Sequence, residues 1–243
     1  MHDDIIDEAA VRRGRTSINF AWGNHLSVLV GDYLYMHAMK MALDEGNLEI
    51  LKALSNATIQ MIEGEILGLE SNGRADLSVD DYFEIVHRKT AALFGASCTI
   101  PAILTGASDA DLDALRTYGE NLGICFQLID DLLDFTSSTE ILGKPALSDL
   151  KEGKLTLPVL LALPHCSDPD RRVVERVITD KQLCDTDAEV ILRIIAQHRT
   201  VERTREIARE YADRARAAIS RFASSPSREA LDAALDFVVV RER

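Results

Sequence analysis

The sequence has few of the residues that break helices, with 13 glycines and 6 prolines among its 243 residues. Its cysteines are also sparse, and no two of the four have the Cys-x-x-Cys spacing of a zinc or redox site. No apolar run approaches the roughly 18 residues that span a bilayer, and the acidic first residues do not resemble a signal peptide. We therefore expect reduced thiols in a cytoplasmic protein with no transmembrane segment.

Basic residues are outnumbered, because 27 lysines and arginines face 40 aspartates and glutamates, for a formal net charge of -13. Such a chain repels the phosphates of nucleic acids, so nucleic acid is excluded as a partner. The 47% of hydrophobic and 28% of charged residues are typical of an ordinary globular protein. The length is that of one sizeable domain, and we expect a single domain over residues 1–243.

Strand-like alternation is absent, and alanine, leucine, glutamate and arginine fill the segments between the few glycines and prolines. The fold is therefore expected to be all-α. Helices are predicted at 19–44, 47–72, 79–105, 109–138, 154–164, 168–180, 186–197, 198–223 and 226–240. The least helical stretch, residues 137–153, is long for a loop inside a domain and is a candidate lid.

Two short clusters of aspartates have the same spacing, DDIID at 3–7 and DDLLD at 130–134. On a helical wheel with about 100° per residue, Gln127 and the three aspartates of the second cluster fall within one stripe about 100° wide. The neighbouring residues on the rest of that wheel are apolar, which is typical of a buried helix. We interpret the stripe as facing a crevice rather than as a solvated surface, since unanswered buried aspartates would repel one another.

Magnesium is the cation that fits two such clusters. Calcium prefers six to eight oxygens, often from a loop, whereas Mg²⁺ takes one or two carboxylates and completes its shell with water and substrate phosphates. Bound metal ions would also allow an acidic protein to bind an anion. Basic residues near the clusters support a phosphate site: Arg12, Arg13, Lys89, Lys144 and Lys154.

These residues resemble the trans-isoprenyl (polyprenyl) diphosphate synthases. The motifs stand in the order of that family along nearly the whole chain: HDDIIDEAAVRRG (2–14), GDYL (31–34), QMIEGE (60–65), RKTAALFG (88–95), FQLIDDLLD (126–134), LGKP (142–145) and DLKEGKLTLP (149–158). The resemblance implies a helical bundle around a central cavity, usually as a homodimer. It also implies that isopentenyl diphosphate is joined head to tail to an allylic diphosphate.

The resemblance assigns roles to individual residues by their place in these motifs. Asp3, Asp7 and Asp130 would hold Mg²⁺, with Asp4, Asp131 and Asp134 supporting them. Arg12 would bind the allylic diphosphate and Arg13 the isopentenyl diphosphate. The allylic diphosphate site would be completed by Lys89, Thr90, Gln127, Lys144 and Lys154. The residues expected to take part in catalysis are Asp3, Asp7, Asp130, Lys89 and Lys144.

The chain departs from the family at its start, because it begins almost on the first aspartate motif. We expect it to lack the N-terminal helices of the family and part of the isopentenyl diphosphate site. A non-catalytic partner subunit, or an inactive fragment of a synthase, is therefore an alternative. A class I terpene cyclase is a second one, although the GKP and GKLTLP motifs favour chain elongation.

Residues 19–44 resemble the longer-chain synthases that make quinone side chains. Their large residues Trp22, Tyr33, Tyr35 and Met36 are expected in the core. The product length and the allylic primer stay open.

Overall fold

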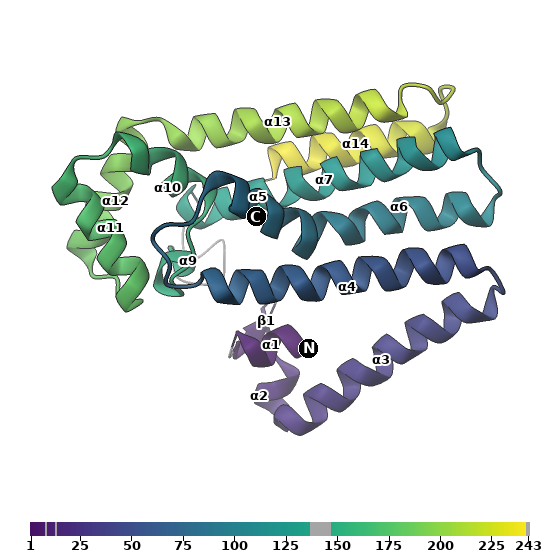
Figure 1. The fold of residues 1–243 in the computed structure, drawn as a ribbon, viewed down its shortest axis with the longest axis horizontal. Helices are drawn as coiled ribbons and strands as arrows, with labels where there is room; N and C mark the ends of the chain where they lie inside the picture. The colour runs from purple at the N-terminus through teal and green to yellow at the C-terminus, as the bar shows by residue number, and fades with distance from the viewer. Residues whose placement is uncertain (8, 13, 137–146, 242–243) are drawn as a thin grey trace. The chain divides into compact units, whose positions relative to one another are not determined.

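The computed structural model describes residues 1–7, 9–12, 14–136 and 147–241, and most of them lie in helices (Figure 1). The all-α class expected from the sequence is confirmed. The chain divides into two compact units, Met1–Leu54 and Ser55–Arg243. The single domain expected over residues 1–243, with the family's first helices lacking, stays a prediction.

The first unit is built from short elements around one long helix. It holds α1 (His2–Ile6), the antiparallel strands β1 (Val11–Arg12) and β2 (Arg15–Thr16), α2 (Ile18–Trp22), α3 (Asn24–Asp44) and the first turns of α4 (Leu48–Ser71). The helix expected at 19–44 is interrupted at Gly23, whose φ of 85° is outside the helical region. The sequence predicts no strands, so the pair β1–β2 is a difference from that prediction. Each strand has only two residues, which is too short for an alternating pattern to appear in the sequence.

The second unit contains the rest of α4 and all later elements. These are α5 (Val79–Val86), the π-helical turn η1 (His87–Ala91), α6 (Ala92–Leu104), α7 (Asp109–Thr136), α9 (Ser148–Lys151), α10 (Leu157–Ala162), the 3₁₀ turn η2 (Leu163–His165), α11 (Asp168–Asp180), α12 (Asp185–Gln197), α13 (Thr200–Ile219) and α14 (Pro226–Val240). The helix expected at 79–105 is thus helical throughout, with a π turn in its middle.

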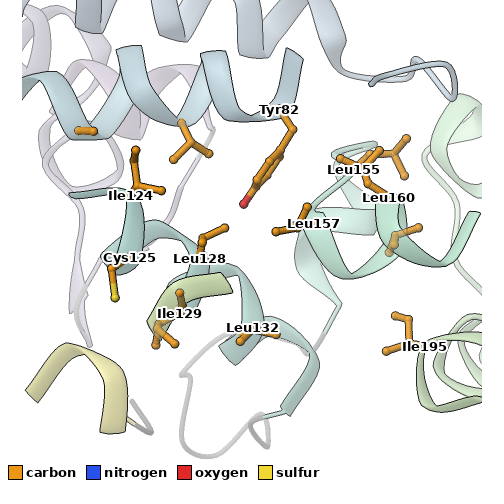
Figure 2. Close-up of a cluster of buried hydrophobic side chains, with 14 of the residues drawn as sticks. Tyr82, Ile124, Cys125, Leu128, Ile129, Leu132, Leu155, Leu157, Leu160 and Ile195 are labelled. Atoms are coloured by element: carbon orange, nitrogen blue, oxygen red, sulfur yellow. The ribbon is translucent and has the colours of Figure 1, made fainter. Parts of the chain in front are cut away.

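Helix α7 forms the centre of the second unit, with α6, α13 and α14 packed along it (Figure 1). The sequence prediction that the apolar part of its wheel is buried is confirmed for Cys125, Leu128, Ile129, Leu132 and Leu133. Figure 2 shows α7 side chains meeting Leu157 and Leu160 of α10 and Tyr82 of α5 in one apolar cluster. This packing fixes α7, and with it the second aspartate cluster.

The large residues of α2 and α3 are not in a core, contrary to expectation. Trp22, Tyr33, Tyr35 and Met36 are 68%, 62%, 43% and 61% exposed, and Ser27 and Ala42 are the buried residues of α3. The few short elements of the first unit do not cover this helix. Among the described residues, no helix combines the length and the apolar content that a membrane span requires. All four cysteines are free.

Candidate active site

The three aspartates of the second cluster have different surroundings. The side chain of Asp130 is 49% exposed, whereas Asp131 and Asp134 are 6% and 1% exposed. The two buried carboxylates are hydrogen-bonded to protein groups, as buried charged groups must be. Asp130 is therefore the aspartate of this cluster that offers its oxygens to a ligand from solution.

Asp131 lies at the centre of a chain of hydrogen bonds. Its Oδ2 accepts from the hydroxyl of Tyr82 at 2.5 Å, and its Oδ1 accepts from Nε2 of Gln127 at 2.8 Å. The Oε1 of Gln127 in turn accepts from the hydroxyl of Thr90 at 2.8 Å. Gln127 and Thr90, which the sequence motifs assign to one site, are thus brought together from α7 and η1.

The pKa of Asp131 is raised to about 7, first by burial and then by the nearby charge of Asp149, while the hydrogen bonds from Tyr82 and Gln127 oppose the shift. Burial likewise raises the pKa of Tyr82 well above its usual value, with the charge of Asp131 adding to the effect. The phenol therefore keeps its proton and acts as a donor.

Asp134 connects the end of α7 to α9. Its Oδ1 accepts from the backbone nitrogen of Ser148 at 3.1 Å and from the Ser148 hydroxyl at 2.8 Å, and its Oδ2 accepts from the nitrogen of Asp149 at 3.1 Å. A carboxylate that accepts from the first amides of a helix acts as its cap. Lys154, soon after α9, is one-third exposed and forms an ion pair with Glu152 at 2.6 Å.

Lys89 and Thr90 lie on the π-helical turn η1, a kind of helix irregularity that is frequent at functional sites. Glycines on both neighbouring helices allow close contact with this turn. A Cβ on Gly64 of α4 would lie 2.8 Å from Cβ of Arg88, with the Lys89 nitrogen closer still. A Cβ on Gly123 of α7 would lie 2.7 Å from Cα of Ala91. The backbone that carries Lys89 is therefore held between α4 and α7.

The two glutamates beside Gly64 pair with the two basic residues of η1. Lys89 Nζ lies 2.6 Å from Oε2 of Glu65, and Arg88 forms ion pairs with Glu63 and, at 2.5 Å, with Glu84. The Lys89 side chain is 41% exposed, so its ammonium remains accessible to an anion. The ion pair with Glu65 holds that ammonium in place.

Asp130 is paired with a residue that follows α14. Its carboxylate forms an ion pair with Arg241, whose guanidinium lies 4.7 Å from the centre of the Phe126 ring. The Arg241 side chain is 15% exposed, so the pair is shielded from solvent on the arginine side.

The first aspartate cluster, in the first unit, likewise combines a buried aspartate with exposed ones. Asp4 is 4% exposed and accepts from Nη1 of Arg12 at 2.8 Å, and its backbone oxygen accepts from Nδ2 of Asn19 at 2.9 Å. Burial alone would raise the pKa of Asp4, but the hydrogen bonds from Arg12 and the α-amino group outweigh it and lower that pKa. Asp3 and Asp7 are exposed. Arg13 and Lys144, also expected at the site, lie outside the described residues.

The exposed aspartates are suited to Mg²⁺. Among the residues that the structure describes, no three histidine, cysteine or acidic side chains converge into a closed metal site. Mg²⁺ does not need one, because it keeps several waters and takes one or two carboxylates plus substrate phosphates. Asp130 on α7, Asp3 on α1 and Asp7 directly after α1 provide oxygens of this kind.

Sequence reasoning missed three residues of this region, namely Tyr82, Glu65 and Arg241. Glu65 belongs to the QMIEGE motif and Arg241 to the last residues of the chain, VVVRER, and the sequence alone assigns a role to neither. Tyr82 follows the N-cap Ser78 by one turn, on the apolar face of its helix. A phenol on such a face requires a buried partner, and that signal could have identified it.

Comparisons with known proteins show the family to which this chain belongs. The family model for polyprenyl synthetase matches residues 1–195. The octaprenyl diphosphate synthase of Escherichia coli K12 is 38% identical over 243 residues, which are 100% of this chain and 75% of that protein. The crystal structure of a decaprenyl diphosphate synthase from Rhodobacter capsulatus has a TM-score of 0.93 at 38% identity, and the match covers 100% of this chain and 74% of that one.

A further solved structure contains ligands. It is the polyprenyl synthase of Caulobacter crescentus CB15 complexed with calcium and isoprenyl diphosphate, and it matches with a TM-score of 0.93 at 38% identity over 100% of this chain and 74% of its own. The aspartate clusters, the Lys89–Thr90 turn and these matches lead to one assignment: this chain belongs to the polyprenyl synthetase family of prenyltransferases.

Proposed function

We propose that this chain joins isopentenyl diphosphate head to tail to an allylic diphosphate and so makes an all-trans polyprenyl diphosphate. The observation that carries the proposal is the 2.8 Å hydrogen bond between Thr90 and Gln127. Two residues 37 positions apart, assigned to one diphosphate site by separate motifs, meet beside Lys89. Membership of the polyprenyl synthetase family supports the same reaction and favours chain elongation over the cyclase alternative.

Mg²⁺ is the metal that we propose for this chemistry. Asp3, Asp7 and Asp130 would hold it. Asp4, Asp131 and Asp134 would support these ligands indirectly, because their own hydrogen bonds to other residues fix the segments that carry the ligands. When bound, Mg²⁺ neutralises the charge that develops on the departing diphosphate. The Caulobacter relative is complexed with calcium and isoprenyl diphosphate, which supports a role for a divalent cation in this family of proteins.

The chain's own residues bind and orient the allylic diphosphate. Lys89 places a positive charge beside it, Thr90 and Gln127 present a hydroxyl and an amide, and Arg12 and Lys154 add cationic donors. We also propose Arg13 for isopentenyl diphosphate and Lys144 for the allylic diphosphate, both by motif alone.

The reaction breaks the allylic C–O bond and releases diphosphate. The double bond of isopentenyl diphosphate then attacks the allylic cation and forms the new C–C bond. The cation that results loses a proton from the carbon next to its charged carbon, and the released diphosphate accepts this proton. Because the cation formed on ionisation reacts with water, apolar walls that exclude water belong to this mechanism. The central cavity that would provide such walls is part of the proposal.

We further propose a long-chain product and a homodimer. The similar octaprenyl and decaprenyl synthases support the product class. The exposed apolar side chains of α3, including Leu29, Tyr33, Met36 and Met41 at 61–70% exposure, support a surface that a second copy covers. The cytoplasmic location expected from the sequence stays a prediction.

The test is incubation of the purified chain with farnesyl diphosphate, radiolabelled isopentenyl diphosphate and Mg²⁺, with an EDTA control. Chromatography of the extracted products gives their length. EDTA-sensitive elongation to a ladder of prenyl products is the expected outcome. A hydrocarbon formed from farnesyl diphosphate without isopentenyl diphosphate would instead indicate a cyclase. If the chain makes no product by itself but alters the products of an active synthase with which it is mixed, it is a partner subunit.

A further inference from the structure

Tyr82 is a buried polar residue for which the reaction gives no direct role. It lies on α5, whose start is fixed by a capping box between Ser78 and Asp81, and its side chain is 5% exposed. In Figure 2 its hydroxyl points from α5 into the cluster formed by α7 and α10. The ring is also packed edge-on against Phe83, with 5.5 Å between the ring centres. The phenol is thus held firmly, with its one donor aimed at α7.

The acceptor of that donor is Asp131, which connects Tyr82 to the candidate substrate residues. Tyr82 donates to Oδ2 at 2.5 Å, and Gln127 donates to Oδ1 of the same carboxylate at 2.8 Å. A carboxylate held at both oxygens cannot rotate freely. It therefore offers Gln127 a fixed acceptor, one helical turn away on the same face of α7.

The orientation of the Gln127 amide follows from that acceptor. Only the Nε2 side of the amide can donate, so Nε2 faces Asp131 and Oε1 faces Thr90. The Thr90 hydroxyl then donates to Oε1 at 2.8 Å. Four side chains from α5, α7 and η1 thus form one ordered chain, Tyr82–Asp131–Gln127–Thr90, that ends next to Lys89.

We propose that Tyr82 is a positioning residue for the allylic diphosphate site, which it orders through Asp131 by fixing the Gln127 amide and the Thr90 hydroxyl. This inference rests on the proposed function. Tyr82 touches no substrate in this scheme. Its hydroxyl determines how well Gln127 and Thr90, at the substrate-facing end of the hydrogen-bonded chain, are pre-organised. A misplaced hydrogen-bonding group weakens binding of the diphosphate.

The test is the Tyr82→Phe substitution, which keeps the ring in the core and removes the hydroxyl. We expect KM for farnesyl diphosphate to rise by about tenfold, the usual effect of losing one hydrogen bond to a charged group. Neither KM for isopentenyl diphosphate nor kcat should change by more than about twofold, since the lost order concerns one substrate's binding. Both values come from initial rates with the other substrate at saturation.

Tyr118→Phe is the matched control. Tyr118 is fully buried on α7, and its hydroxyl donates to the backbone oxygen of Leu231 at 2.9 Å. This variant also loses the hydrogen bond of a buried tyrosine, but with a partner outside the Tyr82–Asp131–Gln127–Thr90 chain. We expect its KM values to equal those of the wild type, even if its melting temperature falls. Equal KM values for farnesyl diphosphate in Tyr82→Phe and Tyr118→Phe would overturn the inference.

A second variant covers the case in which Tyr82→Phe does not fold. Asp131→Asn keeps the shape of the side chain but replaces one of the two acceptor oxygens, so the Tyr82–Asp131–Gln127 connection is broken. A raised KM for farnesyl diphosphate supports the inference, whether or not kcat also falls, because Asp131 is also proposed to support the metal ligands. An unchanged KM, or a loss of turnover with no change in KM, contradicts it by making Asp131 dispensable or by giving it a different role.

Failure of the proposed function is recognised separately, because elongation by the wild type is measured first. If the wild type does not elongate, the proposed function fails. Calorimetric binding of farnesyl diphosphate with Mg²⁺ then provides the same comparison of wild type, Tyr82→Phe and Tyr118→Phe. Weaker binding in Tyr82→Phe alone supports the inference, and equal binding in all three overturns it.

Discussion

The ammonium of Lys89 lies 2.6 Å from the carboxylate of Glu65, across the contact between η1 and α4. An anionic substrate that binds Lys89 must therefore compete with a carboxylate of the protein itself. Glu65 is 21% exposed and Lys89 is 41% exposed, so water weakens the pair without removing it.

Glu65→Gln should consequently strengthen binding of the allylic diphosphate. We expect KM for farnesyl diphosphate to fall by about two- to fivefold, in line with the modest free energy of a partly exposed ion pair. Glu63→Gln is the control, because Glu63 pairs with Arg88 instead of Lys89. A rise in KM for Glu65→Gln would mean that Glu65 orients Lys89 for binding rather than competing for it.

Arg241 has a comparable relationship to Asp130, since its guanidinium neutralises the exposed aspartate of the second cluster. A divalent cation at Asp130 has to compete with it. Arg241→Gln should therefore raise the affinity for Mn²⁺, used as a spectroscopic probe for Mg²⁺, by about two- to fivefold. Electron paramagnetic resonance of the protein without substrate measures this directly.

Arg216→Gln is the control for that measurement. Arg216 pairs with Asp236 at 2.6 Å and with Asp232 at 3.4 Å, away from the aspartate cluster. Its loss should leave Mn²⁺ binding unchanged. Equal Mn²⁺ affinity in the wild type and Arg241→Gln would mean either that Asp130 does not bind the metal ion or that Arg241 does not compete with the metal ion for Asp130.

The candidate catalytic residues themselves give the largest expected effects. Asp3→Ala, Asp130→Ala and Lys89→Ala should each reduce Mg²⁺-dependent turnover by at least about 100-fold, the scale of removing a group that stabilises developing charge. The side chains of Lys89 and Asp130 are 41% and 49% exposed and that of Asp3 is also exposed, so circular dichroism should show unchanged helicity. Full activity of Asp130→Ala would sink its assignment as a metal ligand.

The sequence contained much of this site, but not its internal order. Periodicity predicted that α7 is buried around its polar stripe, and motif order predicted that Gln127 and Thr90 share a site. Neither periodicity nor motif order could reveal that Asp131 accepts a hydrogen bond from Tyr82, 49 residues earlier, because that contact depends on how α5 packs against α7. The different surroundings of Asp130 and Asp134 likewise depend on Arg241 and Ser148, which are distant in sequence.

Local departures from the predicted helices have a related cause. Single residues with positive φ, such as Gly23 and Arg199 at 85° and 52°, end or start helices where the composition still favours them. The exposed side chains of α3 show the limit of burial predictions from residue type. An aromatic residue is in a core only where other elements cover it, and that covering is a property of the packed chain.

A pH-dependent contribution to stability comes from Asp187, far from the site in sequence. Its carboxylate accepts from Sγ of Cys184 at 2.9 Å and from Nη2 of Arg176 at 2.5 Å, and these hydrogen bonds, that of Cys184 first, lower its pKa below the usual 3.8. A lowered pKa in the folded state stabilises the protein above the unfolded-state value. This stabilisation is lost as the pH falls through the folded-state value.

Asp187→Asn should therefore be less stable than the wild type by about 1 kcal/mol near neutral pH, the usual contribution of a cap at a helix start. The difference should shrink as the pH falls below about 4, because the carboxyl of Asp187 is protonated first in the unfolded state and then, at lower pH, in the folded state. Urea denaturation near neutral pH and below about pH 4 measures this difference in stability. Asp185→Asn, in the same first turn, is the control. A difference that is constant with pH would show that the charge of Asp187 is not its cause.

Gly64 tests whether the close contact of α4 with η1 is needed to place Lys89. A Cβ there would lie 2.8 Å from Cβ of Arg88 and closer to the Lys89 nitrogen, which is backbone and cannot move aside as a flexible side chain would. Gly64→Ala should thus destabilise the protein by about 1–3 kcal/mol, as overpacking does, and raise KM for farnesyl diphosphate.

Gly68→Ala is the matched substitution one turn along α4, where the nearest atom to a new Cβ is Cγ2 of Ile85 at 3.8 Å. It should instead stabilise the helix by about 0.5–1 kcal/mol, because alanine loses less entropy than glycine there. Urea denaturation of both variants, with KM measured for each, compares the two positions. Equal stability and equal KM would mean that α4 and η1 can separate without disturbing Lys89, so the contact at Gly64 would not determine the geometry of the diphosphate site.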